Sequence, residues 1–486
     1  MIEATLEDLM DATGATLLRG DPTSRFRGVS TDTRSLRGGE LFLALSGPNF
    51  DGNQFASRAL DEGAAALLLR GEGDDVMTLI DPPAITSTRR TERQLPPPGV
   101  LVHPEPRRAM ASLATWHRER LDIPVVGITG SCGKTTTKNI LMELLRDHLG
   151  VTGSPASFNN DIGVPHTLLR AGAEHELLVC EIGTSGPGEI ERLCEVARPS
   201  AGIITMIGSA HLEELGSLEG VAREKGQLAA AIPADGFIVL NADCPFTPLL
   251  RSMTRARVIT FSLEGRGDLN ATDPWFHAGG TTFKLGELEV TSPLLGLHTV
   301  QNLLAALAAC VGLGHELADV LPAVTRLKSE KRRMERIELP GGITLFDDSY
   351  NANPDSARAS VRVLTGVHGH ARRVLVLGDM LELGELSAEL HHEVGRLAAE
   401  AGVDQLWLVG DLTRATAAGA LEAGLPADRV LHWPDRTAAC EAITSLLHDG
   451  DVVLVKASRG SGLDRLVTHI TEHLTPGRGD AAGAVR

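Results

Sequence analysis

The segment GITGSCGKTTTK, residues 127–138, follows the apolar residues 124–126 and constrains the fold more than any other part of the chain. Its glycines let the backbone curl, and a helix that follows would direct free N–H groups at a phosphate. Lys134 can neutralise phosphate oxygens, and the Thr135 hydroxyl can ligate Mg²⁺. The spacing departs by one residue from the common phosphate-loop pattern, because Ile128 stands where that pattern begins with glycine. A glycine-rich helix start without a ligand is the alternative. The predicted nucleotide contacts are Gly130, Ser131, Cys132, Gly133, Lys134, Thr135 and Thr136.

Short β-rich runs alternate with helical segments on both sides of residue 335, and this alternation predicts parallel sheets covered by helices. The length of 486 residues suits two or three domains. We therefore predict an α/β protein of three domains. They are a small N-terminal α/β domain (1–121), a central phosphate-loop ATPase domain on a parallel sheet (122–335) and a C-terminal Rossmann-like domain (336–486).

Two segments of the N-terminal domain carry more specific expectations. The alanine-rich residues 55–69 (FASRALDEGAAALLL) predict a helix. Residues 71–99 are rich in proline, glycine and charge, which predicts a poorly ordered surface insertion.

The composition excludes several classes of protein. The net charge of -17 opposes sequence-independent binding to nucleic acid or anionic lipid. The six cysteines form no Cys-x-x-Cys pair, so neither a zinc cage nor a disulfide framework is predicted. No apolar run approaches the roughly 20 residues that span a bilayer. We expect a cytoplasmic, monomeric protein without membrane insertion.

Two residues after the phosphate loop are candidates for metal chemistry. Glu181 and His211 each follow a predicted strand, and the carboxyl ends of parallel strands meet at the edge where α/β sheets bind ligands. Both side chains could act on a nucleotide metal there, although a solvated cap and a packing histidine are the alternatives. Lys225 lies in a segment with a helical pattern. The pattern alone indicates an ordinary exposed lysine.

Two polar segments of the C-terminal domain also follow predicted strands. In DDSYNANP, Asp347 and Asp348 end a predicted strand, and Asn351 and Asn353 lie in a turn fixed by Pro354. A purely structural turn is the alternative. KASRG supplies Lys456 and Arg459, a cationic loop suited to a carboxylate. A solvated run of charge is its alternative.

Together these segments resemble the Mur ligase family. The resemblance is carried by STDTRSLRGGELFLALSGPNFDG, GITGSCGKTTTK, SFNNDIGVPHTLL, CEIGTSGPGEI, AHLEELGSLEGVAREKG, HTVQNLLAALAA, DDSYNANP, LGDMLELGE and KASRG. It covers nearly the whole chain apart from residues 71–99 and the C-terminal tail.

The resemblance implies a role for each candidate residue. ATP would contact the phosphate loop, and its adenosine would lie near Asn302, Arg333 and Asp347. Two Mg²⁺ ions would involve Thr135, Glu181 and His211, and Lys225 would be carbamylated. A UDP-linked substrate would contact Ser30, Thr31, Asp32 and Arg34, and its sugar-peptide part would contact Asn159, Asn160 and Asp161. The incoming amine would lie near Asn351, Asn353, Lys456 and Arg459.

The implied activity is an ATP-dependent amide ligation. It would join D-alanyl-D-alanine to UDP-N-acetylmuramoyl tripeptide through an acyl phosphate, in peptidoglycan precursor synthesis, with Lys134, Glu181, His211 and Lys225 as catalytic residues. Another ligase of this type, adding a single amino acid or acting on a different acid, is one alternative. A nucleotide-hydrolysing switch is another, although the sequence has no guanine-reading Asn-Lys-x-Asp string. The chain departs from the family pattern at Asn53, Cys244, Thr299 and Arg332, which bears on substrate recognition.

Overall fold

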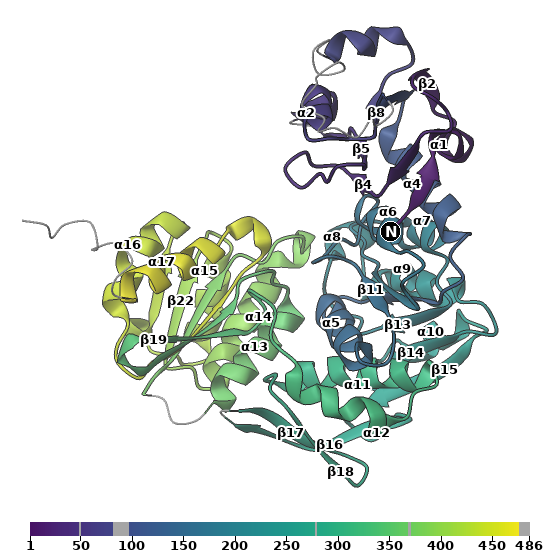
Figure 1. The fold of residues 1–486 in the computed structure, drawn as a ribbon. Coiled ribbons are helices and arrows are strands. Elements are labelled where there is room, and N and C mark those ends of the chain that lie inside the picture. Colours follow the sequence, from purple (N-terminus) through teal and green to yellow (C-terminus); the bar gives the residue numbers. More distant parts are fainter. Residues whose placement is uncertain (48–49, 81–96, 278, 368–370, 476–486) are drawn as a thin grey trace, which may run out of the picture.

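Three α/β units, each with its own main sheet, make up the protein (Figure 1). The computed structural model describes residues 1–47, 50–80, 97–277, 279–367 and 371–475. The N-terminal unit stands on the central unit, and the C-terminal unit lies beside the central one (Figure 1).

The N-terminal unit is built on a five-stranded sheet of order β2-β9-β8-β5-β4. All its neighbouring pairs are parallel except β2 with β9. The strands are β2 (Thr16–Arg19), β4 (Val29–Ser30), β5 (Leu41–Leu43), β8 (Ala66–Arg70) and β9 (Gly99–His103). Two small antiparallel pairs are β1 (Glu3–Thr5) with β3 (Arg25–Arg27) and β6 (Ser46–Gly47) with β7 (Phe50–Asp51), and the helices are α1 (Leu6–Thr13), α2 (Ala56–Asp61) and α4 (Pro106–Arg118).

Two expectations for this unit are corrected. The helix predicted over residues 55–69 ends at Asp61, and Ala66–Arg70 is strand β8, because Gly63 takes a left-handed φ of 92° and the apolar run after it is buried in the sheet. The insertion predicted at 71–99 is ordered over 71–80, where Val76 and Ile80 are buried in the core. Residues 81–96 lie outside the described residues.

The central unit has a nine-stranded sheet of order β11-β12-β10-β13-β14-β15-β16-β17-β18. The pairs from β11 to β16 are parallel, as predicted, whereas β16, β17 and β18 form an antiparallel extension that the sequence analysis did not foresee. The strands are β10 (Val125–Thr129), β11 (Val151–Gly153), β12 (Leu177–Glu181), β13 (Ala201–Ile204), β14 (Phe237–Asn241), β15 (Arg257–Ser262), β16 (Leu269–His277), β17 (Gly280–Leu285) and β18 (Leu288–Ser292). The helices are α5 (Lys134–Leu145), α6 (Gly163–Arg170), α7 (Glu189–Ala197), α8 (Leu212–Leu215), α9 (Leu218–Ala231), α10 (Thr247–Ser252), α11 (Leu297–Gly312) and α12 (Leu317–Val320).

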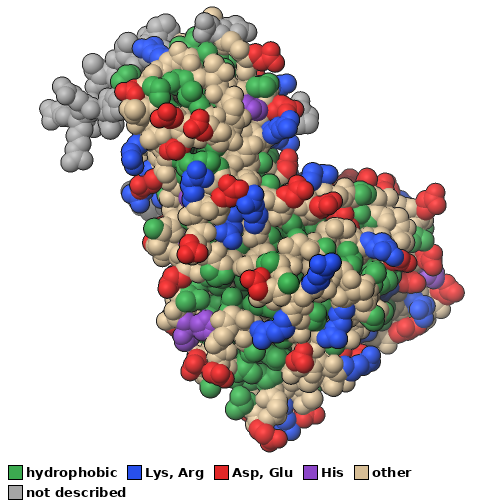
Figure 2. All heavy atoms as spheres, turned by 90° about the vertical axis from the view of Figure 1, so that its right-hand side faces the viewer, with side chains coloured by type: hydrophobic (Ala, Val, Ile, Leu, Met, Phe, Trp, Pro, Cys, Tyr) green, Lys and Arg blue, Asp and Glu red, His purple; other side chains and the backbone are tan. Residues whose placement is uncertain are grey.

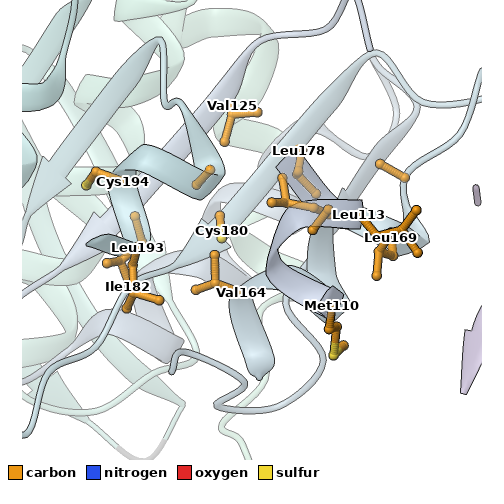
Figure 3. Close-up of a cluster of buried hydrophobic side chains, with 14 of the residues drawn as sticks. Met110, Leu113, Val125, Val164, Leu169, Leu178, Cys180, Ile182, Leu193 and Cys194 are labelled. Carbon is orange, nitrogen blue, oxygen red and sulfur yellow. The ribbon is translucent and has the colours of Figure 1, made fainter. Parts of the chain in front are cut away.

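Successive residues of a strand face opposite sides of the sheet. Side chains of the central strands therefore pack alternately in two separate cores, one on each face. Val126 of β10 packs with α5 and α11, whereas Val125 packs with α4, α6, α7 and α9. Figure 3 shows the second core, where Leu113 of α4 lies beside Leu178 of β12. Helix α4 therefore joins the N-terminal unit to the central unit through a shared core.

The C-terminal unit has a six-stranded sheet of order β19-β20-β24-β21-β22-β23, parallel except for the β19–β20 pair. The short β-rich runs predicted beyond residue 335 thus form the parallel strands of this sheet. The elements are β19 (Glu335–Leu339), β20 (Ile343–Asp348), α13 (Pro354–Gly366), β21 (Arg373–Gly378), α14 (Ser387–Glu400), β22 (Gln405–Val409), α15 (Thr413–Glu422), β23 (Val430–Trp433), α16 (Arg436–Leu446), β24 (Val452–Lys456) and α17 (Asp464–Leu474). One core lies between the sheet and helices α13 and α14, and the other lies beneath α16 and α17.

A buried ion pair ties two loops of the C-terminal unit together. The Asp451 carboxylate is fully buried and accepts hydrogen bonds from Arg372 Nη2 at 2.7 Å and from the His448 amide at 2.8 Å. We predict that Asp451→Ala lowers the free energy of unfolding by about 2 kcal/mol, because it leaves a partly buried guanidinium without its carboxylate. Urea denaturation measures the change. The exposed Asp428→Ala should stay within about 0.5 kcal/mol of wild type, and equal effects would contradict the argument.

The surface carries both signs of charge. Figure 2 shows acidic and basic side chains interspersed over the face that it presents, without a continuous basic area. Among the described residues, no helix is both long enough and apolar enough to cross a bilayer.

Candidate active site

The phosphate loop joins β10 to α5 as the sequence predicted. Gly130 and Gly133 have positive φ angles of 149° and 84°, respectively. A Cβ at Gly130 would lie 1.9 Å from Thr205 Oγ1, and one at Gly133 would lie 2.2 Å from Asn302 Oδ1. Both positions thus require glycine, and the loop leads into the N-terminus of the 12-residue helix α5. The site can bind a phosphate chain by its backbone N–H groups and the helix dipole.

Gly130→Ala should weaken nucleotide binding about tenfold or more. The added methyl group forces Thr205 or the loop to move, and overpacking of this kind costs about 1–3 kcal/mol. Titration with ADP measures the loss. Gly314→Ala, at a positive φ with open space around it, is the matched control and should leave ADP binding unchanged. Equal affinities of wild type and Gly130→Ala would refute this account of the loop.

Glu181 lies at the end of β12 with both carboxylate oxygens occupied. Its Oε2 accepts a hydrogen bond from Thr135 Oγ1 at 2.8 Å, and its Oε1 accepts one from Asn159 Nδ2 at 2.8 Å. The residue is 1% exposed, so the alternative of a solvated cap is wrong. Arg333 Nη2 also donates to Thr135 Oγ1, at 3.2 Å, which brings the segment that precedes β19 to the phosphate loop.

Lys134 starts α5 and folds back over the loop. Its Nζ donates to the Gly130 carbonyl at 2.7 Å. Burial lowers the pKa of Lys134, and the neighbouring Glu181 carboxylate opposes that shift. The side chain therefore lies at the loop with an anionic partner close by, where a phosphate oxygen could replace the carbonyl contact.

His211 and Lys225 lie near this cluster. His211 Nδ1 contacts Glu382 Oε2 of the C-terminal unit at 2.7 Å, and burial together with the charge of Lys225 lowers the pKa of His211. Lys225 is 1% exposed, so its alternative interpretation as an exposed lysine is wrong. Burial and the charge of Lys134 lower the pKa of Lys225 to about 7. A substantial fraction of this amine is therefore neutral near physiological pH.

The polar segments of the C-terminal unit converge on the same place. Lys456 Nζ donates to Asp348 Oδ2 at 2.7 Å and to the Asn351 carbonyl at 3.0 Å. Asn353 Nδ2 contacts Cys132 Sγ of the phosphate loop at 3.1 Å, which joins segments 221 positions apart. Lys456 is 3% exposed, so the alternative interpretation of this lysine as part of a solvated run of charge is wrong. Arg459 of the same loop is exposed.

A cavity of about 1670 Å³ lies between the central and C-terminal units. Most of the predicted nucleotide and amine contacts line it, and the predicted residues at its wall are Ser131, Cys132, Gly133, Lys134, Thr135, Thr136, Asn159, Asn160, Glu181, His211, Asn302, Arg333, Asn351, Asn353, Lys456 and Arg459. Gly130 and Lys225 support this wall without lining it. Residues from segments that are far apart in the sequence thus line one cleft.

Asp347 does not line this cavity, whereas its neighbour Asp348 does. The two end strand β20, where adjacent side chains face opposite sides. Asp347 is 4% exposed, accepts a hydrogen bond from the Ser349 amide at 3.0 Å, and burial raises its pKa. Asp348 therefore belongs to the candidate site, and alternation along the predicted strand was the signal that could have separated the two.

The residues predicted for the UDP end lie in the N-terminal unit and do not reach the cavity. Ser30 ends β4, and Thr31, Asp32 and Arg34 follow it in a turn where Arg34 Nη2 pairs with Asp32 Oδ2 at 2.7 Å. The hydrogen bonds from Arg34 lower the pKa of Asp32. Asp161 also lies outside the cavity wall, and its Oδ2 lies 3.7 Å from Nη1 of Arg107.

The four departures from the family pattern have local partners. Asn53 is buried. Its Nδ2 donates to the Arg70 carbonyl at 2.8 Å, and its Oδ1 accepts from the Arg70 amide at 2.9 Å. Arg332 has a φ of 63° and pairs with Asp464 at 3.0 Å, so an arginine occupies a left-handed position that suits glycine. The Cys244 amide donates to the Asn241 carbonyl, and the Thr299 hydroxyl donates to the Gly296 carbonyl.

Several contacting residues were not among the predicted site residues. Asp355 Oδ2 accepts from the Ser209 amide at 2.6 Å, and a Cβ at Gly208 would lie 2.4 Å from the same oxygen. Tyr350 lies under the Arg333 guanidinium at 4.0 Å. These contacts, like that of Glu382, join two units, and no local pattern in the sequence indicates them.

Comparison with known proteins agrees with this architecture. The chain matches the Mur ligase family catalytic domain over residues 25–116, the Mur ligase middle domain over 128–310 and the Mur ligase glutamate ligase domain over 332–459. A relative from Escherichia coli is 35% identical over 485 residues, which cover 98% of this chain and 100% of the relative. The chain therefore belongs to the Mur ligase family.

The relatives also have particular names. The E. coli protein is named UDP-N-acetylmuramoyl-tripeptide–D-alanyl-D-alanine ligase. The crystal structure of MurF from Acinetobacter baumannii superposes with a TM-score of 0.84 at 28% identity, covering 97% of this chain and 99% of that one. MurF ligase from Thermotoga maritima in complex with ADP superposes with a TM-score of 0.74 at 26% identity, covering 92% and 98%.

Proposed function

We propose that this protein is an ATP-dependent amide ligase that adds D-alanyl-D-alanine to UDP-N-acetylmuramoyl tripeptide in peptidoglycan precursor synthesis. The observation that carries the proposal is the single cleft in which the phosphate loop and Glu181 face Lys456 and Asp348 of another unit. The full-length similarity to ligases with this name supports it.

The cleft suits activation of a carboxylate. A carboxylate resists attack by an amine, because its charge repels the nucleophile and oxide is a poor leaving group. Transfer of the γ-phosphoryl group of ATP to the tripeptide carboxylate gives an acyl phosphate and ADP. The dipeptide amine then displaces phosphate and loses a proton. Lys134 and the loop N–H groups stabilise the negative charge that moves during phosphoryl transfer.

The residues present fit Mg²⁺. Thr135 and Glu181 supply a hydroxyl and a carboxylate that lie 2.8 Å apart, and Mg²⁺ prefers such oxygen donors together with phosphates and water. Within the described part of the chain, no three acidic, His or Cys side chains are grouped so that they could hold a metal, and phosphate oxygens and water would complete the coordination. Bound Mg²⁺ would supply charge neutralisation. We propose His211 as a contributor to a second ion and a carbamylated Lys225 as an anionic group beside it.

The remaining substrate contacts are distributed over the units. We propose that the turn at Ser30, Thr31, Asp32 and Arg34 contacts the uridine end and that Asn159, Asn160 and Asp161 lie near the sugar-peptide part. Asn302, Arg333 and Asp348 would surround the adenosine side. Residues from two units wall the cleft, and closure around the substrates would keep water from the acyl phosphate.

An amide-forming assay tests the proposal. Purified protein receives ATP, Mg²⁺, UDP-N-acetylmuramoyl tripeptide and either D-alanyl-D-alanine or single amino acids, and mass spectrometry identifies the product. We expect the pentapeptide product with the dipeptide alone. A product with a single amino acid but none with the dipeptide would assign the chain to another reaction of the family. ATP turnover without any acceptor would favour the switch protein.

A further inference from the structure

A loop of the C-terminal unit, residues 381–386, contacts the central unit at the edge of the cleft. Oε2 of Glu382 in this loop lies 2.7 Å from Nδ1 of His211. Leu390 of the following helix α14 packs against the core that contains Leu212 as well as against the core of its own unit. The two units therefore meet through an apolar contact that holds Glu382 beside His211.

The backbone is strained on both sides of this contact. His211 and Glu382 have positive φ angles of 60° and 63°, which residues with a side chain rarely adopt. Gly384 has a φ of 56°, and a Cβ at this position would lie 3.4 Å from the Cα of Glu213. The Glu382 side chain is 63% exposed, and an ion pair with so exposed a partner adds little to stability. Strain that brings two side chains together without a gain in stability indicates a functional role for the contact.

The contact determines which nitrogen of His211 is available to a ligand. An ionised carboxylate only accepts hydrogen bonds, so Nδ1 carries the hydrogen that is donated to Glu382. In the neutral ring Nε2 then has the free lone pair, and none of the described residues forms a hydrogen bond with it. His211 and Glu382 both line the cavity that contains the phosphate loop. The imidazole is therefore held in the tautomer in which Nε2 can bind a cation.

We propose that Glu382 is a positioning residue that orients His211 for the second divalent cation when the C-terminal unit contacts the central unit. This inference rests on the proposed function, in which His211 contributes to that ion, and adds the carboxylate that orients it. A carboxylate behind a metal-binding imidazole fixes the tautomer and increases the basicity of the other ring nitrogen. Because this carboxylate belongs to another unit, the cation site is complete only when the two units are in contact.

Titration with Mn²⁺ tests this role without the ligase reaction. Mn²⁺ binds the kinds of ligand that suit Mg²⁺, and electron paramagnetic resonance measures the free ion. In the presence of a non-hydrolysable ATP analogue, we expect wild type to bind two Mn²⁺ ions and Glu382→Ala to bind the second about tenfold more weakly. Glu382→Gln keeps an acceptor for the hydrogen on Nδ1 and should bind the second ion nearly as tightly as wild type. Glu385→Ala, which removes an exposed glutamate of the same loop, is the matched control and should match wild type.

A double variant separates the orientation of His211 from a structural effect of the loop. If Glu382 acts through His211, adding Glu382→Ala to His211→Ala causes no further loss of Mn²⁺ affinity, whereas an independent structural effect adds to the loss. Wild-type affinity of Glu382→Ala, additive losses in the double variant, or a wild type that binds a single ion would each overturn the inference. Failure of the proposed function is a different result, because it appears as the absence of pentapeptide product, while the Mn²⁺ titrations still decide the role of Glu382.

Discussion

Lys134→Ala should reduce ADP release in the complete ligation assay by about two to three orders of magnitude. Lys134 begins α5 at the phosphate loop and donates to the Gly130 carbonyl at 2.7 Å. It is thus placed to neutralise the phosphoryl oxygens as charge moves from the nucleotide to the acceptor. Steady-state rates at saturating ATP measure the effect on the chemical step.

The exposed Lys284 offers a control of the same type. Its side chain lies on β17 and pairs with Asp273, away from the cleft. Lys284→Ala should therefore keep the wild-type rate. A Lys134→Ala protein that releases ADP at nearly the wild-type rate would be incompatible with phosphoryl transfer at this loop.

Lys225→Ala should lower the ligation rate by about a hundredfold and recover part of it with short carboxylic acids such as acetate. The pKa of about 7 leaves part of the buried amine neutral, and only the neutral amine can add to CO₂ to give a carbamate and a proton. The neutral fraction increases as the pH rises through 7, so the carbamate should form more readily above that pH. An added acid would supply the carboxylate that the variant lacks.

A second buried lysine provides the control for rescue. Lys138 is 2% exposed and donates to the carbonyls of Ser154 and Ala156, so it has a structural role. Lys138→Ala should lose activity that acetate does not restore. Full activity of Lys225→Ala, or equal rescue of both variants, would rule out the carbamate.

The sequence predicted the sheets well, because buried parallel strands are short apolar runs that end in polar residues. The β-rich runs on both sides of residue 335 are strands, among them β12, β13 and β14 of the central unit and β20 to β24 of the C-terminal unit. The run Ala66–Arg70 was misassigned to a helix because its alanine and leucine composition suits both states, and burial in the sheet decided the outcome. Strands β16 to β18 are partly exposed and lack such a signal.

The site was predictable where a motif fixes the local backbone and less so where tertiary packing decides. The phosphate loop follows from its glycines and from the strand before it. The burial of Lys225 does not follow from its helix, since charged neighbours there suggest an exposed face. The contacts of Cys132 with Asn353 and of His211 with Glu382 arise from the docking of two units, which no local spacing encodes.

Transfer of the γ-phosphoryl group to the substrate carboxylate is the central claim, and oxygen labelling tests it most directly. The tripeptide substrate is prepared with ¹⁸O in its terminal carboxylate and converted in unlabelled water with ATP and D-alanyl-D-alanine. An acyl phosphate predicts that the released inorganic phosphate carries one ¹⁸O atom from that carboxylate. Amide product accompanied by phosphate without the label would contradict the account.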